Sequence, residues 1–228
     1  MFEFVIPARN EGDRVGALIT RLRATHGTAA RIVVADNASD DATAEAAKAA
    51  GADDVVHVGR VGKGFAVTAA LKSCTGALVM LCDADIQGLD RASVTELLAA
   101  VRDRGVPLGR LDLRRSPEDA PVTTLTAGPL LRLLGAGPTR EPLGGLMVLD
   151  RAFALGLHLP GDWGFDVALT LAGLDRAGEI PEHAAPGVVH RRRPLGAYQA
   201  MAEQVGAAIL RHHRLLPWDH ANCTRCPA

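Results

Sequence analysis

The sequence predicts an α/β fold in which a mostly parallel sheet is flanked by helices. Short apolar runs rich in Val, Ile and Leu alternate with amphipathic segments through the amino-terminal half. Strands and helices that alternate at this spacing are joined by right-handed crossovers, which make the strands parallel. The clearest run spans residues 77–82 and is followed by two carboxylates, Asp83 and Asp85. A continuous apolar run of this length is typical of a strand buried on both faces.

The elements of the amino-terminal half follow from this alternation. Strands are expected at 2–7, 31–35, 54–58 and 77–85. Helices are expected between them: one capped by Asn10, one over 43–50, and one opened by Gly62. Side chains alternate along a strand, so Asp83 and Asp85 are predicted to project to the same side at a carboxyl strand end, where such sheets bind ligands.

Beyond Asp90 the pattern is less regular. The expected helices are 94–101, 122–134, one from Trp163 onward and 194–215, and the expected strands are 106–113, 143–149 and 187–190. The helix over 122–134 is predicted although it contains Gly128-Pro129. We expect one domain over residues 1–215, followed by a carboxyl-terminal tail over 216–228.

Length and charge limit the function classes. A chain of 228 residues with 48% hydrophobic content can bury one sizeable core. Its 25 Lys and Arg residues nearly balance 26 Asp and Glu residues, which argues against a nucleic-acid or anionic-membrane partner. There is no apolar run long enough to span a membrane, and no basic leader precedes the first strand. We therefore expect a soluble, cytoplasmic protein; whether it forms a homodimer stays open.

The pair Asp83 and Asp85 is the first candidate for chemistry. Two carboxylates on one side suit a hard divalent cation that is shared with substrate phosphates. Taken alone, an Asp-x-Asp more often begins a turn or caps a helix. Other motifs fail: 59–64 has the wrong glycine spacing for a P-loop, no Gly-x-Gly-x-x-Gly follows the first strand, and there is no Ser nucleophile elbow.

The order of four amino-terminal stretches indicates a family. These stretches are 5–11, 34–43, 62–64 and 83–85. At these spacings they resemble the nucleotide-sugar-binding half of glycosyltransferases with the Rossmann-like GT-A fold, whose Asp-x-Asp binds a metal on the donor diphosphate. The resemblance covers residues 2–90 and implies a donor-binding half over 1–90 and an acceptor and metal-histidine half over 91–215.

Four later stretches indicate a narrower group. They are 122–134, 141–145, 163–166 and 189–195. They resemble the corresponding stretches of retaining glucosyl-3-phosphoglycerate synthases. This resemblance implies that His190 joins Asp83 and Asp85 as the third protein ligand of Mg²⁺ or Mn²⁺. A histidine after a strand is more often structural or superficial, but the Arg-rich flank of His190 suits a diphosphate.

The chemistry and the resemblance together suggest roles for further residues. The expected donor-nucleotide residues are Pro7, Ala8, Arg9, Glu11, Asp36, Lys63 and Ala84. The expected catalytic residues are Asp85, Asp166 and Lys63. Asp166 resembles the acid that contacts hydroxyls of the transferred sugar, and its alternative role is a helix cap or a surface salt bridge. Lys63 is expected to meet phosphate or the donor sugar, with a surface lysine at a helix start as the alternative.

The predicted reaction is metal-dependent transfer of a sugar from a UDP- or GDP-sugar to a small acceptor. A divalent ion would neutralise charge that develops on the β-phosphate. The resemblance implies retention, and without a well-placed carboxylate nucleophile the expected route is front-face attack. A sugar-phosphate nucleotidylyltransferase is the second candidate, although 7–11 lacks its Gly-rich basic loop. A non-catalytic nucleotide-sugar-binding relative is the third.

The acceptor region departs from the resembled family. Glu118 and Asp119 occupy a turn that in the family is Gly-rich and Arg-containing and holds the acceptor phosphate, and Arg192 replaces an Asn. The expected acceptor-binding residues are Glu118, Asp119, Thr123 and Arg192. Acids would repel a phosphate. The sequence therefore predicts an uncharged, cationic or zwitterionic acceptor and poor use of 3-phosphoglycerate.

Two cysteines near the end of the chain form a separate motif. Cys223 and Cys226 have the spacing of a zinc-binding pair, and His220, His212 and His213 precede them. A single pair without an evident fourth ligand is a weak signal. A frayed tail with incidental thiols is the favoured interpretation.

Overall fold

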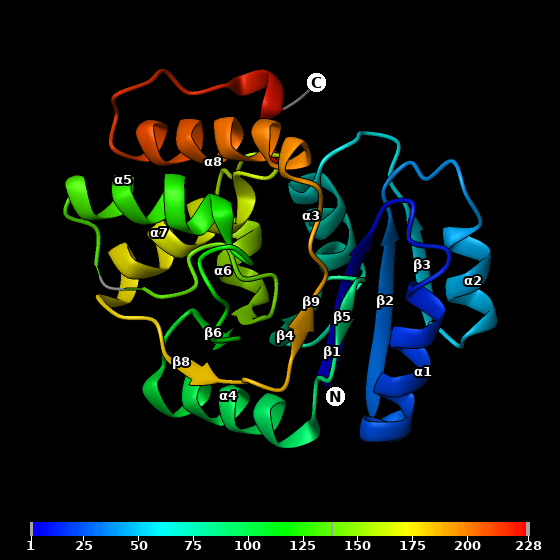
Figure 1. Cartoon of the computed structure of the whole chain (residues 1–228). Helices are drawn as coiled ribbons and strands as arrows, with labels where there is room; N and C mark the ends of the chain where they lie inside the picture. The colour runs from blue at the N-terminus through cyan, green and yellow to red at the C-terminus, as the bar shows by residue number, and fades with distance from the viewer. Residues whose placement is uncertain (1, 138, 227–228) are drawn as a thin grey trace.

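The computed structural model describes residues 2–137 and 139–226. A seven-stranded sheet in the order β3-β2-β1-β4-β7-β6-β8 lies at its centre, with helices packed against it (Figure 1). Every pairing within this sheet is parallel except those of β7, which is antiparallel to both β4 and β6. The predicted mostly parallel sheet is confirmed. A second, two-stranded sheet joins β5 to β9.

The strands are short and mostly buried. They are β1 (Phe2–Ala8), β2 (Ala30–Asp36), β3 (Asp54–His57), β4 (Leu78–Leu81), β5 (Ile86–Gln87), β6 (Leu108–Asp112), β7 (Met147–Asp150), β8 (Glu182–Ala184) and β9 (Val189–His190). The α-helices are α1 (Val15–His26), α2 (Thr43–Ala49), α3 (Lys63–Ser73), α4 (Arg91–Arg104), α5 (Gly128–Leu133), α6 (Arg151–Gly156), α7 (Phe165–Ala177) and α8 (Gln199–His212).

The alternation of side chains along the strands divides the core into two layers. On β1, Phe4 and Ile6 pack in one cluster with apolar residues of α1 and α4. Val5, which points to the opposite face, packs with residues of α3, α6 and α7. A third cluster joins α5, α7 and α8, which lie together at the left of Figure 1. Both faces of the sheet are thus covered, as its continuous apolar runs require.

Two predicted local features of the amino-terminal half are wrong. Asn10 does not cap α1: it has a left-handed φ of 55°, and its side chain accepts a hydrogen bond from Asp40 N instead. The predicted strand over 77–85 ends at Leu81, and Asp83 begins a turn closed by a hydrogen bond from Ile86 N to Asp83 O at 3.4 Å. Asp83 and Asp85 are therefore oriented by a turn and not by strand alternation.

The helix predicted over 122–134 is present but not regular. A π-helical turn, η2 (Thr123–Ala127), precedes α5, and Gly128 N donates to Thr123 O five residues earlier. Pro129 has no N–H to continue an α-helical ladder, and the wider turn accommodates it. The long helix predicted over 194–215 is a 3₁₀ turn, η3 (Leu195–Tyr198), followed by α8, which ends at His212.

Several elements were not predicted from the sequence. Helix α6 and strands β5 and β8 are too short to show a period, although Asp150 caps α6 by accepting from Phe153 N at 2.7 Å. The expected frayed tail is also wrong, because Thr224 N donates to Leu159 O at 2.9 Å and Cys223 is buried. Across the described residues, no helix combines the length and apolar character needed to cross a membrane.

The amino end of α3 packs directly against the backbone of residues 160–161. Phe65 N donates to Gly161 O at 3.1 Å, and a Cβ at Gly64 would overlap the carbonyl oxygen of Pro160. Because the obstacle is backbone, it cannot rotate away. This contact fixes the start of α3 relative to the segment that leads into α7.

We predict that Gly64→Ala lowers the free energy of unfolding by about 1–3 kcal/mol, although Gly→Ala within a helix ordinarily raises it. Gly206→Ala in α8 is the matched control, since its Cβ would make only ordinary contacts at 3.7 Å and 3.8 Å. It should be neutral or stabilising by up to about 1 kcal/mol. Urea unfolding of both variants provides the measurement, and equal stabilities would contradict the packing argument.

Candidate active site

A cavity of about 360 Å³ opens where β1 and β4 end. Its walls come from the turn after β1, the start of α3, the Asp83–Asp85 turn, the start of η2 and α7, and the segment after β9. The charged side chains on these walls are Arg9, Glu11, Lys63, Asp83, Asp85, Arg115, Asp119, Asp166, His190, Arg191 and Arg193. Such a mixture of acids and bases in one concave site is typical of a binding or catalytic centre.

Lys63 is the centre of the charge network. Its Nζ lies 2.7 Å from Asp166 Oδ2 and 2.9 Å from Asp83 Oδ1. The Lys63 and Asp166 side chains are only 5% and 1% exposed, so neither charge could remain there alone. Burial by itself would lower the pKa of Lys63, but the carboxylates of Asp166 and Asp83 raise it above its usual value. Lys63 is therefore a cation that orders two acids.

The two acids respond differently to this environment. Burial raises the pKa of Asp166, and the charge of Asp83 adds to that effect. Burial acts in the same direction on Asp83, but Lys63 and then His190 bring the pKa of Asp83 below its usual value. Asp166 Oδ1 is buried and has no hydrogen-bond partner among the described residues. Asp166 Oδ1 is therefore an unpaired buried acceptor, which is uncommon in folded proteins.

The two-stranded sheet brings His190 to the Asp-x-Asp turn. Ile86 of β5 lies opposite His190 of β9 in the antiparallel register. As a result, His190 Nε2 lies 3.0 Å from Asp85 Oδ1 and 3.9 Å from Asp83 Oδ2. Residues more than a hundred positions apart in the chain meet through this ladder of two residue pairs.

Arg115 connects His190 to a buried acid. Its Nη2 lies 2.5 Å from Glu141 Oε2, and its Nη1 lies 3.3 Å from His190 Nδ1. Glu141 is buried, so the ion pair fixes Arg115 and, through it, one edge of the imidazole. The orientation of His190 is thus set on both sides of the ring.

Arg110 supports the floor of the site from below. It is fully buried, and its guanidinium donates to Gly144 O at 2.6 Å, to Asp166 O at 2.9 Å and to Thr170 Oγ1. Next to it, a Cβ at Gly145 would overlap the carboxylate of Asp83. The loop that carries Gly144 and Gly145 is therefore held by Arg110 directly under Asp83.

The donor set of Asp83, Asp85 and His190 fits a divalent ion. Two carboxylates and an imidazole suit Mg²⁺ or Mn²⁺ with open coordination positions for substrate oxygens. His190 Nε2 and Asp85 Oδ1 lie 3.0 Å apart, which is the separation of two neighbouring ligand atoms that are each about 2.1 Å from one ion. The ligand atoms of these three side chains are not close enough together to form a closed cage. In the part of the chain that the structure describes, one trio of His, Cys, Asp or Glu has all its ligand atoms within 4.8 Å of one another, and that trio lies elsewhere.

Most residues predicted for the site line the cavity. These are Pro7, Ala8, Arg9, Glu11, Lys63, Asp83, Ala84, Asp85, Asp119, Thr123, Asp166 and His190. Asp36, predicted to hold the nucleoside, is not among the lining residues; it is buried, with Oδ2 3.2 Å from His57 Nδ1 and no partner for Oδ1. Its neighbour Asn37 lines the cavity in its place.

Two predicted acceptor residues do not line the cavity. Glu118 is exposed and accepts from Ser116 Oγ at 3.0 Å. Arg192 is exposed and forms an ion pair with Asp119, whose pKa this hydrogen bond lowers. The course of the backbone explains this difference. It brings Arg191 and Arg193 to the cavity wall and leaves Arg192, between them, outside it.

Sequence reasoning missed several wall residues. Arg193 lies over the Trp163 ring at 5.1 Å from its centroid, Tyr198 Oη accepts from Arg193 N at 2.9 Å, and all three line the cavity. Arg115 also lines it. The sequence did offer a signal for the cation–π contact. Trp163 lies close in sequence to the predicted site residue Asp166, and a run of three arginines follows His190. The position of Arg115 had no local signal.

Sequence and structure comparisons place this site in a known family. The sequence profile described as Glycosyl transferase family 2 matches residues 3–144, which is more than half of the chain. The chain belongs to glycosyltransferase family 2. It is accordingly a glycosyltransferase. A search of curated protein sequences gave no significant match.

Solved structures of a glycosyltransferase superpose on nearly the whole chain. Glucosyl-3-phosphoglycerate synthase from Mycobacterium tuberculosis, in complex with Mn²⁺, UDP-glucose and phosphoglyceric acid, matches with a TM-score of 0.85 and 26% identity over 96% of this chain and 82% of that one. The same enzyme with Mg²⁺ and UDP gives a TM-score of 0.83 and 27% identity over 96% and 81%. A mycobacterial protein gives 0.80 and 29% over 93% and 74%. The resemblance inferred from the motifs is confirmed.

We predict that Lys63→Met lowers the free energy of unfolding by about 3–5 kcal/mol at neutral pH, because it leaves two buried carboxylates without their cation. The folded variant would bind a proton that the unfolded chain releases, so the loss should be smaller at pH 5 than at pH 8. Lys72→Met on the exposed face of α3 is the control and should change stability by less than about 0.5 kcal/mol. Urea titrations in chelator at both pH values test this, and equal losses for the two variants would contradict it.

Proposed function

We propose that this glycosyltransferase transfers a sugar from a UDP- or GDP-sugar to a small-molecule acceptor, with a divalent ion and with retention of anomeric configuration. One observation carries the proposal: Asp83, Asp85 and His190 meet at one cavity with the Lys63–Asp166 pair. The structurally similar synthase was solved with Mn²⁺ or Mg²⁺ and with UDP or UDP-glucose. The donor set of this chain suits the same kind of ion.

The residues around the cavity divide the work of donor binding. The turn after β1, with Ala8, Arg9 and Glu11, and Asn37 after β2 offer backbone and polar groups for the nucleoside. Arg191 and Arg193, which flank the far side, can pair with the diphosphate. Asp83, Asp85 and His190 would hold the ion, which neutralises the charge that develops on the β-phosphate.

Asp166 has the environment of a sugar-binding acid. Its Oδ2 is bonded to Lys63, and its Oδ1 is buried without a protein partner. A hydroxyl of the transferred sugar would satisfy Oδ1, which otherwise costs free energy as an unpaired buried acceptor. Lys63 acts as a positioning residue, since two of its three donors already serve Asp83 and Asp166.

Front-face attack accounts for retention with these residues. The acceptor oxygen attacks the anomeric carbon on the side from which the diphosphate departs, and the bond between that carbon and the phosphate oxygen breaks. The proton of the acceptor hydroxyl passes to the departing phosphate oxygen. No protein base is needed, which fits a cavity where Asp166 is tied to Lys63 and Asp83 is tied to both Lys63 and His190.

The loop after β1 and the residues of the cavity argue against the other two functions. A nucleotidylyltransferase would need a basic Gly-rich loop after β1, where this chain has Pro7 to Glu11. A non-catalytic relative would have no need of a complete Asp83, Asp85 and His190 set in one cavity. Two assays separate all three functions. A glycosyltransferase releases nucleoside diphosphate from a donor sugar, a nucleotidylyltransferase releases pyrophosphate from a nucleoside triphosphate and a sugar phosphate, and a binding protein releases neither.

We predict that Asp85→Asn reduces kcat/KM for metal-dependent sugar transfer by about 100-fold or more, because the ion loses a charged ligand. Asp103→Asn, at an exposed position of α4, is the matched control and should leave turnover unchanged. The measurement is release of nucleoside diphosphate in chelator-treated buffer with added Mn²⁺. Normal turnover by the Asp85 variant would overturn the metal assignment.

We infer that the acceptor is small and that 3-phosphoglycerate is a poor one. Only one of the two turn acids, Asp119, faces the cavity, and Arg192 partly neutralises it. The repulsion of an acceptor phosphate is therefore carried by a single carboxylate near the surface. That is less than two unpaired acids would give, but it still disfavours an anion.

We predict that Asp119→Asn raises kcat/KM for 3-phosphoglycerate several-fold, whereas Glu118→Gln, outside the cavity, does not change it. Both variants are assayed with 3-phosphoglycerate and with a panel of uncharged and cationic hydroxyl acceptors. Efficient transfer to 3-phosphoglycerate by the unaltered enzyme would refute the inference. The anomeric proton coupling of the product, measured by NMR, tests retention in the same experiment.

A further inference from the structure

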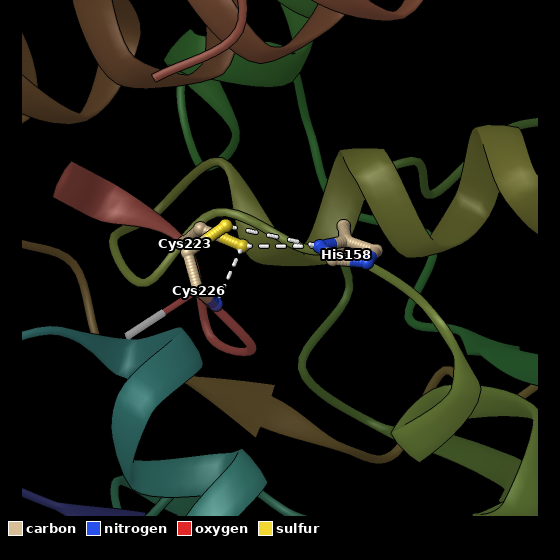
Figure 2. A group of neighbouring side chains, drawn as sticks. All are labelled: His158, Cys223 and Cys226. Carbon is tan, nitrogen blue, oxygen red and sulfur yellow. Dashed lines mark hydrogen bonds between the residues drawn. The ribbon is translucent and has the colours of Figure 1, made fainter. Parts of the chain in front are cut away.

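Three side chains of types that can ligate a metal meet beside the segment that leads into α7. His158 lies between α6 and α7, and Cys223 and Cys226 lie near the carboxyl end of the chain. Figure 2 shows both sulfur atoms turned toward the His158 ring. Their ligand atoms all lie within 4.8 Å of one another, which no other trio of His, Cys, Asp or Glu among residues 2–137 and 139–226 achieves.

The separations match those of ligands around one metal ion. Cys223 Sγ lies 3.5 Å and Cys226 Sγ 3.9 Å from His158 Nδ1. In a tetrahedral zinc site, Zn–S and Zn–N bonds of about 2.3 Å and 2.0 Å set neighbouring S and N atoms roughly 3.6 Å apart. Both sulfur–nitrogen separations are therefore close to those that one tetrahedral zinc ion requires.

The backbone around Cys223 stabilises a thiolate. Arg225 N and Cys226 N donate to Cys223 Sγ at 3.4 Å and 3.3 Å. Thiolates are the form of cysteine that binds metal.

A fourth ligand lies one turn away in the same segment. His220 Nδ1 is 3.6 Å from Cys226 Sγ, although His220 is not yet close to the other two ligand atoms. Its side chain is exposed and sits on the 3₁₀ turn η4 (His220–Asn222), so rotation about its side-chain bonds is unobstructed by core packing. Two cysteines and two histidines complete a common structural zinc set.

We propose that His158, Cys223 and Cys226 bind a structural zinc ion, with His220 as the fourth ligand. Two thiolates and two imidazoles in tetrahedral geometry select zinc over Mg²⁺ and Mn²⁺, which prefer oxygen. Binding releases the thiol protons to solvent. The site is distinct from Asp83, Asp85 and His190, which offer mainly oxygen ligands.

The ion would fasten the end of the chain to the segment that holds the active site. Residues 219–226 already pair with that segment, through Gly161 N to Asn222 O at 2.9 Å and Thr224 N to Leu159 O at 2.9 Å. Gly161 in turn contacts the start of α3, where Lys63 lies. Coordination of one zinc ion by His158, Cys223 and Cys226 would hold these two segments together.

Metal content of the full chain tests the proposal directly. We expect about one zinc ion per chain by mass spectrometry, retained by Asp85→Asn and lost in Cys223→Ser and Cys226→Ser. Cys74→Ala, a buried cysteine outside the cluster, is the control and should keep the ion. Replacement by Co²⁺ should give a thiolate charge-transfer band in the unaltered chain and none in the Cys223 variant. Zinc that stays in both cysteine variants, or a chain that binds none, overturns the proposal.

Experiments on the unaltered chain keep the test independent of whether the variants fold. A strong chelator should lower Tm by about 5 °C, restored by Zn²⁺ and not by Mg²⁺. It should also expose both cysteines to alkylation and speed hydrogen exchange at residues 157–163. Full-rate alkylation of both thiols before chelation would contradict zinc binding. So would a mass of the purified chain that is lower by two hydrogens than the fully reduced mass, because it would show a Cys223–Cys226 disulfide.

The fourth position has its own variant. His220→Ala should weaken zinc binding at least tenfold in competition with a chromophoric chelator, while leaving the Co²⁺ thiolate band in place. His213→Ala, on the neighbouring helix end, is the control and should bind zinc normally. Unchanged affinity in the His220 variant would refute its assignment as a ligand.

Discussion

The site depends on one ammonium group placed between two carboxylates. Lys63 joins Asp83, which follows β4, to Asp166 in the first turn of α7. Lys63 and Asp166 are almost removed from water, and Asp83 is half-buried. Without Lys63, the two acids would repel each other in a medium that screens poorly. The ion pair therefore fixes the turn after β4 against the start of α7, and the cavity lies beside this contact.

Further buried charges extend this network outward. Arg110 holds the loop beneath Asp83 through Gly144 O and supports Asp166 through its backbone carbonyl. Arg115 links buried Glu141 to His190. Arg110 and Arg115 hold the residues that in turn contact Asp83, Asp166 and His190. The side chains that line the cavity therefore have little conformational freedom before a ligand binds. Such preorganisation is what electrostatic catalysis requires.

Local patterns were sufficient for the alternating elements and for Asp83, Asp85 and Lys63, because each stands at the boundary of a periodic segment. They could not place side chains whose partners are remote. Arg192 resembled a site residue in the sequence, yet the backbone lets Arg191 and Arg193 line the cavity instead. His158 carried no motif, and only the fold brings it to Cys223. The residues that flank a position in the sequence do not determine which distant residues it contacts in the fold.

The narrow ladder of β5 and β9 has a consequence for synthesis. His190 reaches Asp85 through two residue pairs that span about a hundred positions of sequence. As the chain leaves the ribosome, β1 to β4 can pair in parallel before the later residues are made, because their contacts are more local. Until the segment near residue 190 has emerged, the Asp83–Asp85 turn lacks its imidazole neighbour. A nascent chain therefore has four paired parallel strands well before His190 can reach Asp85, and these two side chains meet only late in synthesis.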